Sequence, residues 1–298
     1  MKLWKRPLKW MTTWAGNAIL AIPLTRRMLN REFVRGDDRS IFWMNRLFDN
    51  CRPGATFRWE YSFRRKTMHL PVNPKVVRSW KLALSTRAHE PHMIRYYDRF
   101  ITERKDASVY FDIGANYGIH ASFMLAAGFQ CVLFEPQSEC IEYIRAMAKI
   151  NGYEPRIEQC VLSNALGEIS FFVSDSTWFS SVSKEAVEAN DEKAREVKVQ
   201  ARTLDSFTAE TNIYPDLIKI DVEGHEHAVL EGALGTLRKC DPTIVVEIWP
   251  ASLTRVATYE LLAGEGFKCA ALRDDGMVPV KNADEMLGKG TADYVFVK

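Results

Sequence analysis

The chain has 298 residues, of which 47% are apolar and 26% are charged, and its formal net charge is +2. This length and apolar content allow a large buried core, and they exclude a small scaffold held together by disulfides. The six cysteines show no paired C-x-x-C spacing, so we expect free thiols and a cytoplasmic protein.

The first 35 residues are strongly basic, whereas the remainder of the chain is net acidic. Within them, residues 10–24 (WMTTWAGNAILAIPL) form an apolar stretch that is too short to span a bilayer and is interrupted by Pro23. Three interpretations stay open: a helix docked on the main domain, peripheral contact with the inner face of a membrane, and a signal peptide, which lacks a small-residue cleavage site. The basic residues are Lys2, Lys5, Arg6, Lys9, Arg26, Arg27, Arg31 and Arg35, and the apolar ones that would dock or insert are Trp4, Trp10, Trp14, Ile19 and Leu20.

The next segments carry weaker signals. Residues 57–72 (FRWEYSFRRKTMHLPV) alternate in polarity, which indicates a hairpin. Residues 89–101 (HEPHMIRYYDRFI) have helical spacing of their apolar side chains, which predicts a helix before the first core strand. No stripe of alternating basic and aromatic residues suggests a nucleic-acid partner.

From residue 109 onward, β-branched runs alternate with helical stretches, which is typical of an α/β doubly wound parallel sheet. Two further extended segments, 168–174 and 196–204, predict an inserted hairpin whose strands are joined by a helix-prone stretch over 183–194. Sheets of this kind bind ligands at the carboxyl ends of their strands. The predicted core strands are 109–113, 131–135, 156–162, 216–222, 243–249, 268–273 and 293–298, and the predicted helices are 119–128, 138–152 and 225–240.

The first two core strands end in a pattern that suggests a nucleoside ligand. Asp112 is followed by a turn between Gly114 and Gly118, with the spacing D-x-G-x-x-x-G instead of the G-x-G-x-x-G of most dinucleotide sites. We expect a side chain at Gly114 to block the ligand and leave the fold largely intact. Glu135 ends the second strand, where a carboxylate can accept hydrogen bonds from ribose hydroxyls.

A dense group of titratable residues follows the strand at 216–222. Asp221, Glu223, His225 and Glu226 lie within six residues, and a hydroxyl nucleophile needs a general base of such a type. His225 is alternatively a helix cap, and Asp221 alternatively a structural carboxylate. Glu247 ends the next strand, but its spacing from Asp221 is no diagnostic metal motif, so we expect no metal.

Five blocks, DIGANYG, FEP, TLDSF, DLIKIDVEGHE and VVEIWP, resemble the FkbM-type S-adenosylmethionine-dependent methyltransferases over roughly residues 88–250. The resemblance implies a class I methyltransferase domain over 88–298, with a Rossmann-like, doubly wound seven-stranded sheet whose last strand is antiparallel to its neighbours, the inserted hairpin, and an N-terminal extension over 1–87. It implies transfer of the cofactor's methyl group to a hydroxyl of a carbohydrate, a glycolipid or a related natural product. If the N-terminal segment contacts a membrane, we expect a lipid-linked acceptor.

The resemblance also implies roles for single residues, although Asn164 stands where family members often have Asp. Ser180 and Ser181, in the stretch TWFSS (177–181), line the site or are ordinary turn residues, Glu90 in HEP approaches the pocket, and His120 and His227 serve packing or solvent contacts. A nicotinamide-dependent oxidoreductase and a non-catalytic, membrane-associated interaction protein remain as alternatives. The implied cofactor contacts are Asp112, Gly114, Ala115, Asn116 and Gly118 at the methionine part, Glu135 at the ribose, and Leu162, Ser163 and Asn164 at the adenine, and we add Asp221 to them. The catalytic residues predicted from the titratable group itself are Asp221, Glu223 and His225.

Overall fold

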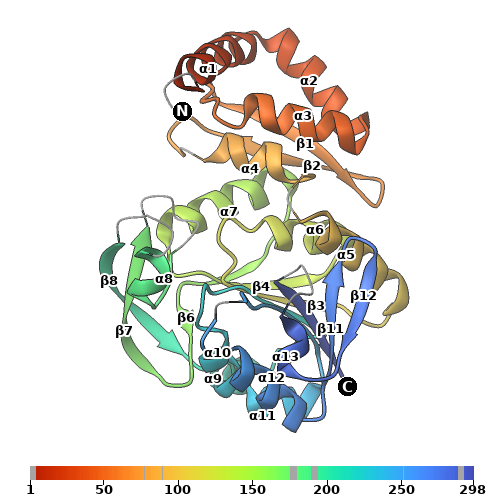
Figure 1. Ribbon diagram of the computed structural model, residues 1–298, viewed down its shortest axis with the longest axis vertical. Helices are drawn as coiled ribbons and strands as arrows, with labels where there is room; N and C mark the ends of the chain where they lie inside the picture. The colour runs from red at the N-terminus through yellow and green to blue at the C-terminus, as the bar shows by residue number, and fades with distance from the viewer. Residues whose placement is uncertain are drawn as a thin grey trace. The chain divides into compact units, whose positions relative to one another are not determined.

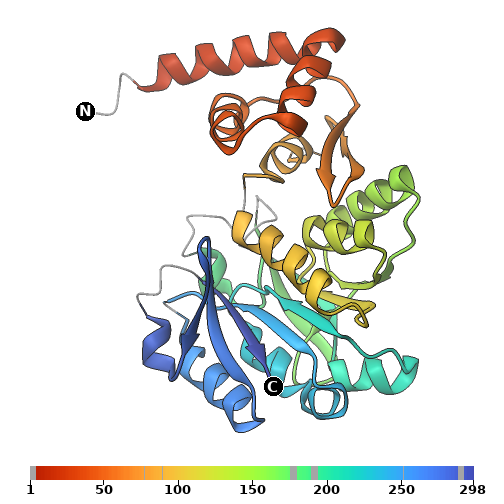
Figure 2. The same ribbon diagram turned by 90° about the vertical axis from the view of Figure 1, so that its right-hand side faces the viewer.

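The computed structural model describes residues 5–76, 78–88, 90–174, 180–188, 194–250, 252–287 and 292–298, with side chains outside 5–12 and 185–186 (Figures 1 and 2). Its contacts divide the chain into two compact units. The N-terminal unit comprises residues 1–94 and 142–154, and the sheet unit comprises residues 95–141 and 155–298. The functional division into 1–87 and 88–298 stays a prediction.

The N-terminal unit combines helices with one hairpin. Pro23 separates the first two helices because proline has no N–H to donate and is tolerated in the first turn of a helix. The predicted hairpin is confirmed, with antiparallel pairing from Phe57 opposite Val72 to Phe63 opposite Lys66. Its elements are α1 (Lys5–Ala21), α2 (Pro23–Arg35), α3 (Asp38–Phe48), β1 (Phe57–Phe63), β2 (Lys66–Val72) and α4 (Ser79–Ser85).

Aromatic side chains form the core of the N-terminal unit. Trp59 of β1 lies edge-on to Trp80 of α4, with ring centroids 4.9 Å apart, and also packs against Phe33 of α2 at 5.3 Å. Asn30 of α2 fixes the helix to the strand, because its amide donates to the carbonyl of Glu60 (2.9 Å) and accepts from the N–H of Glu60 (3.1 Å). The core therefore holds α2 against the open edge of β1.

The sheet unit contains an eight-stranded sheet in the order β12-β11-β13-β10-β9-β3-β4-β5. The strands from β10 to β5 are parallel, whereas β13 is antiparallel to both of its neighbours, which confirms the doubly wound sheet and the orientation of its last strand. The elements of the sheet and its helices, some of which extend into the N-terminal unit, are α5 (Pro91–Glu103), β3 (Val109–Ile113), α6 (Ile119–Ala127), β4 (Gln130–Phe134), α7 (Ser138–Asn151), β5 (Arg156–Glu158), α9 (Leu204–Thr211), β9 (Leu217–Ile220), α10 (Glu226–Glu231), α11 (Leu234–Cys240), β10 (Thr243–Glu247), α12 (Arg255–Gly264), β11 (Lys268–Arg273), β12 (Gly276–Val280), α13 (Ala283–Met286) and β13 (Asp293–Val297).

Alternating side chains of the strands meet helices on both faces of the sheet. Phe111 of β3 contacts Phe207 of α9, with ring centroids 5.7 Å apart. Its neighbour Tyr110 points the other way and contacts Tyr97 of α5 at 6.1 Å. Helices α9 to α13 thus cover one face, and α5 and α6 cover the other (Figure 1). This sandwich leaves the carboxyl ends of the parallel strands available for a site.

A second, smaller sheet has the order β6-β8-β7 and is built by β6 (Val161–Leu162), β7 (Gly167–Ser174) and β8 (Ala194–Arg202). The antiparallel pair β7–β8 confirms the inserted hairpin. The predicted strand over 156–162 is wrong in its extent, because β5 joins the main sheet and β6 pairs with β8. Helix α8 (Lys184–Glu188) covers the start of the stretch 183–194, of which residues 189–193 lie outside the described part of the chain.

The prediction of one helix over 225–240 is also wrong. The chain forms α10 and α11 with a break at Gly232. A Cβ atom at Gly232 would lie 2.0 Å from the backbone oxygen of Ser163, so the helix pair passes directly over the end of β6. β12 is an additional strand that was not predicted. Its exposed and partly buried residues alternate at the edge of the sheet, so no continuous apolar run marks it.

All six cysteines are free, as expected. Among the described helices, none combines the length and the apolar character needed to cross a membrane.

Candidate active site

The turn between β3 and α6 adopts a left-handed backbone at Gly114 (φ 79°), Asn116 (φ 48°) and Gly118 (φ 73°). A Cβ atom at Gly114 would lie 1.9 Å from the backbone oxygen of Asp221, which follows β9. Glycine is therefore required here by the neighbouring strand end. The expectation that Gly114→Val leaves the fold largely intact is wrong, because the added side chain would push these two loops apart.

Glu135 ends β4 with its carboxylate buried beneath the turn. One carboxylate oxygen accepts from the N–H of Asn116 and the other from the N–H of Gln137, each at 2.8 Å. Burial raises the pKa of Glu135 to about 7, although these backbone bonds act in the opposite direction. Each oxygen retains a further lone pair, so the group can still accept hydrogen bonds from ligand hydroxyls.

Acidic side chains gather after β9. Asp221 forms an ion pair of 2.8 Å with Lys219, whose side chain is 3% exposed. Burial, together with the charges of Asp221 and Glu226, raises the pKa of Glu223 to about 8. Burial likewise raises the pKa of Glu226 to about 7. The backbone of Glu223 is itself left-handed (φ 52°), a conformation that non-glycine residues seldom adopt.

Glu247, at the end of β10, belongs to the same group of acids. Burial and the charges of Asp221 and Asp293 raise its pKa to about 11. Because β10 pairs with β9, Glu247 lies near Asp221 at the same edge of the sheet. Among the described residues, no group of three or more His, Cys, Asp and Glu side chains is arranged to hold a metal ion.

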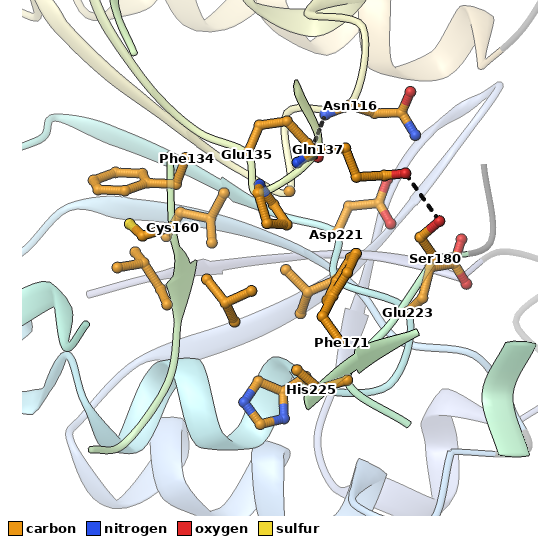
Figure 3. Close-up of a pocket in the computed structure, with 17 residues that line it drawn as sticks. Asn116, Phe134, Glu135, Gln137, Cys160, Phe171, Ser180, Asp221, Glu223 and His225 are labelled. Carbon is orange, nitrogen blue, oxygen red and sulfur yellow. Dashed lines mark hydrogen bonds between the residues drawn. The ribbon is translucent and has the colours of Figure 1, made fainter. Parts of the chain in front are cut away.

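His225 lies apart from the carboxylates on the same loop. Its Nε2 atom is 2.9 Å from the hydroxyl of Ser163, and burial lowers the pKa of the imidazole. The neighbouring Asn164 donates to the carboxylate of Glu231 (2.9 Å). Figure 3 shows the imidazole at the opposite end of the pocket from Asn116 and Glu135. His225 is therefore a neutral ring that is anchored beside the end of β6.

A pocket lies between the strand ends and β7, with a cavity volume of about 70 Å³ (Figure 3). Around it, the open depression comprises about 600 Å³. Eight of the residues singled out from the sequence line it, namely Gly114, Asn116, Glu135, Leu162, Ser180, Asp221, Glu223 and His225. Those that lie outside its lining are Glu90, Asp112, Ala115, Gly118, His120, Ser163, Asn164, Ser181, Glu226, His227 and Glu247.

Asp112 is buried behind the pocket. Its Oδ2 atom accepts from the N–H of Ala121 (3.1 Å), whereas its Oδ1 atom has no hydrogen-bond partner among the described residues. Burial raises its pKa. Ser181 supports the loop after β9 by donating to the carbonyl of Glu223 (2.7 Å). Residues 177–179 of the TWFSS stretch lie outside the described residues, and Glu90 belongs to the N-terminal unit.

Sequence reasoning missed two side chains that close the pocket, Gln137 and Phe171. Gln137 accepts a hydrogen bond of 3.2 Å from the hydroxyl of Ser180, so the segment after β7 is tied to the end of β4. Gln137 directly follows the FEP block, and this adjacency is the signal that could have identified it. Phe171 offered no such signal, because it reaches the pocket only through the pairing of β7 with β8.

A polar groove of about 490 Å³ adjoins the pocket and shares Pro136, Gln137 and Phe171 with it. Gln159 is ordered at the groove by donating to the carbonyl of Pro136 (3.2 Å) and to the hydroxyl of Ser138 (2.8 Å). Gln200 lines the far part of the groove on β8. The groove also carries the charged residues Glu139, Arg195 and Lys198 beside its three glutamine amides.

The family profile described as the Methyltransferase FkbM domain matches residues 112–265, which include the glycine turn, Glu135 and the acids after β9. The chain belongs to the FkbM methyltransferase family. S-adenosylmethionine is accordingly the cofactor expected of this methyltransferase domain. Glu135 retains free lone pairs and would hold the ribose, and the backbone of the glycine turn would hold the methionine part. These placements stay predictions.

Solved structures of several methyltransferases are similar in fold to the chain. A methyltransferase FkbM from Methylobacillus flagellatus KT is 13% identical, with 65% of this chain and 44% of that chain covered and a TM-score of 0.42. The chain thus spans less than half the length of that protein. An O-methyltransferase from Bacillus cereus in complex with SAH is 15% identical, with 70% and 81% covered and a TM-score of 0.41. A 16S rRNA methyltransferase from T. thermophilus in complex with AdoMet and guanosine is 11% identical, with 83% and 51% covered and a TM-score of 0.45. No curated protein sequence matches the chain.

Proposed function

We propose that the chain methylates a hydroxyl oxygen of a carbohydrate, a glycolipid or a related natural product. The observation that carries this proposal is the set of three glutamines in the groove beside the pocket, Gln137, Gln159 and Gln200. Their amides both donate and accept hydrogen bonds, and the groove adds charged side chains that also bond hydroxyls. Such groups suit the many hydroxyls of a sugar. The ring of Phe171, shared by groove and pocket, adds an apolar surface for the face of a sugar ring.

The acids of the pocket support the choice of oxygen as the nucleophile. A hydroxyl attacks slowly near neutral pH unless a base removes its proton, and an ideal base has a pKa close to the working pH. Glu223, with a pKa of about 8, fits this role better than an exposed carboxylate. Asp221 is held beside it by Lys219 and orients the acceptor. When bound, the cofactor supplies the electrophilic methyl group.

The experiment that tests this function follows methyl label from the cofactor into a panel of glycans, glycolipids, phenols and RNA. We expect label in the carbohydrate fraction as an alkali-stable methyl ether. Label in RNA, or label released by mild alkali as from an ester, would contradict the proposal. Gln200→Ala should raise the KM for the acceptor and leave cofactor affinity unchanged, whereas Gln130→Ala, which alters an exposed glutamine at the start of β4, should change neither.

We further propose peripheral contact of the N-terminal segment with a membrane that presents the acceptor. Trp14 and Ile19 of α1 are 67% and 39% exposed, whereas Leu20 is buried and is not available for insertion. Trp4 lies outside the described residues, as does the side chain of Trp10. Tryptophan favours the interfacial layer of a bilayer. Trp14→Ala should reduce sedimentation with anionic liposomes, while Trp43→Ala, a change at a 49% exposed residue of α3, should not. Equal binding by both variants would speak for a merely solvated Trp14.

A further inference from the structure

A second cavity, remote in sequence from the methyltransferase motifs, lies within the N-terminal unit. It has a volume of about 610 Å³ and lies between α2 and β1. Five arginines line it: Arg26, Arg27, Arg31 and Arg35 from the helix, and Arg58 from the strand. Asn30 lies in its wall, where its two hydrogen bonds to Glu60 fix the distance between helix and strand. The cavity is therefore a built feature of the packed unit.

The arginines converge for geometrical reasons. Arg27, Arg31 and Arg35 follow one another at intervals of four residues, so they share one side of α2. Arg26 is held by a bond of 3.2 Å to the carbonyl of Leu20, and its guanidinium lies 4.7 Å from the ring centre of Phe57. Asn30 bonds both backbone groups of Glu60, and alternate residues of a strand direct these groups to the same edge. The backbone of Arg58 therefore also faces the side that α2 covers.

The charges of this cavity are not compensated from within. In the part of the chain that the structure describes, no carboxylate forms an ion pair with Arg27, Arg31, Arg35 or Arg58. Glu60 is the acidic residue in the lining, and its carboxylate lies 3.6 Å from the imidazole of His69. Like charges at intervals of four residues destabilise a helix, so this stripe needs another explanation than helix stability.

Compensation of the helix dipole does not supply that explanation. Basic residues near the end of a helix can bond its last carbonyls. In α2, Arg87 already does so, since it donates to the carbonyls of Phe33, Val34 and Gly36. The end of α2 thus does not require Arg35, and Arg27 and Arg31 lie too far before it to serve this purpose.

We propose that this cavity binds a phosphate group, and that its size and the number of its arginines suit a diphosphate. A guanidinium presents a planar fork of donors that matches two oxygens of one phosphate, and arginine is the preferred residue for such recognition. Several forks around one cavity can hold both phosphates of a diphosphate. The phosphate belongs either to a lipid head group or to a free phosphoryl compound, since the recognised chemistry is the same. The site does not depend on the proposed acceptor or on methyl transfer.

The test compares two double variants of the full chain that remove the same charge. Arg27→Gln with Arg31→Gln alters the cavity, while Arg39→Gln with Arg46→Gln alters exposed arginines of α3. Calorimetry measures binding of inorganic pyrophosphate. Sedimentation measures binding to vesicles of phosphatidylcholine with and without phosphatidic acid. Thermal unfolding establishes that both double variants are folded.

We expect the cavity variant to lose about tenfold or more in affinity for at least one probe, because two charge-assisted contacts are removed, while the control pair keeps its affinity. If pyrophosphate binds and releases the protein from the vesicles, the site accepts free phosphoryl compounds in addition to lipid head groups. Binding of the phosphatidic acid vesicles alone identifies the lipid head group. Equal losses in the two double variants would reduce the effect to overall charge and overturn the proposal, as would a full chain that binds neither probe.

Discussion

Three carboxyl groups around the strand ends, those of Glu135, Glu223 and Glu226, are held with pKa values of about 7, 8 and 7. Burial is the main cause in each case, because a low-polarity environment disfavours the charged form. Their roles differ with their surroundings. Glu135 accepts backbone N–H bonds from the turn after β3 and from its own loop, and Glu226 accepts one from Gly224. Glu223 lines the pocket with Asp221.

The first prediction concerns Glu223 as the base. A base with a pKa of about 8 is mostly protonated at pH 7, so kcat should rise with pH up to about pH 8. Glu223→Gln should lower kcat about 100-fold, remove this rise and leave the cofactor Kd near its original value. His225→Ala serves as the comparison, since its ring is bonded to Ser163. Should His225→Ala abolish the rise instead, the base would be His225.

The second prediction concerns Glu135 and the cofactor. Glu135→Ala removes an acceptor for the ribose hydroxyls and also leaves the N–H groups of Asn116 and Gln137 without their present partner. We expect cofactor affinity to fall by about 2 kcal/mol, because hydrogen bonds to charged groups contribute roughly 1.5 to 3 kcal/mol. Titration calorimetry with S-adenosylhomocysteine measures this loss. Glu139→Ala, at a residue of the adjoining groove, is the control, and unaltered affinity in Glu135→Ala would remove Glu135 from the cofactor site.

At the scale of elements, the break between α10 and α11 couples the helices to the end of β6. Gly232 makes this close passage, and Asp205 at the start of α9 donates its N–H to the carbonyl of Gly232 at 3.0 Å. Ser163, over which the helices pass, contacts His225. A disturbance at the break should therefore reach the pocket wall as well as the core.

The third prediction follows from this passage. Gly232→Ala places a methyl group against backbone, which cannot move aside cheaply, and should lower the free energy of unfolding by about 1 to 3 kcal/mol. Gly264→Ala is the matched control, because nothing lies within 4 Å of its added Cβ. The control should be neutral or slightly stabilising, by about 0.4 to 1 kcal/mol. Chemical denaturation measures the unfolding free energy of both variants. Equal stability of the two would show that the segment around Ser163 moves aside without cost.

At the scale of the whole molecule, the raised carboxyl pKa values connect stability to pH. A carboxyl group with a folded pKa above its unfolded value of about 4.5 stabilises the fold when protonated, and this contribution is lost as the pH rises through the folded pKa. For Glu226 the window runs from about pH 4.5 to about pH 7. Glu135 has the same window, and that of Glu223 extends to about pH 8.

The fourth prediction is that these three carboxyl groups make the cofactor-free protein less stable at pH 8 than at pH 5. Glu226→Gln stays neutral at every pH and keeps an acceptor for the N–H of Gly224, so it should flatten the dependence of Tm on pH. The loss of unfolding free energy between pH 5 and pH 8 should be smaller in Glu226→Gln than in the original chain by on the order of 2 to 3 kcal/mol, since one pKa unit corresponds to about 1.4 kcal/mol. Glu168→Gln, at an exposed residue of β7, should leave the slope unchanged. An identical slope in Glu226→Gln would show that its burial does not control the titration.

The positions of most core strands along the chain and the inserted hairpin could be predicted from the sequence, because apolar runs and glycine stops are local signals. Glu135 and Asp221 could be placed at the pocket for the same reason. Three contacts depend on segments distant in sequence: the close approach of Gly114 to Asp221, the passage of Gly232 over Ser163 and the entry of Phe171 into the pocket. Such contacts leave no local pattern, so they required the structure.

The amide of Asn30 has a consequence for the behaviour of the chain at high concentration. β1 is paired with β2 on one side, and on the other side Asn30 occupies the N–H and C=O groups of Glu60. An uncovered strand edge is a template on which a strand of another molecule can add. The side chain of Asn30 takes the place that such an incoming strand would fill. One asparagine on a helix thus blocks strand addition at this position of β1, and loosening α2 would expose the edge while it also withdraws Phe33 from Trp59.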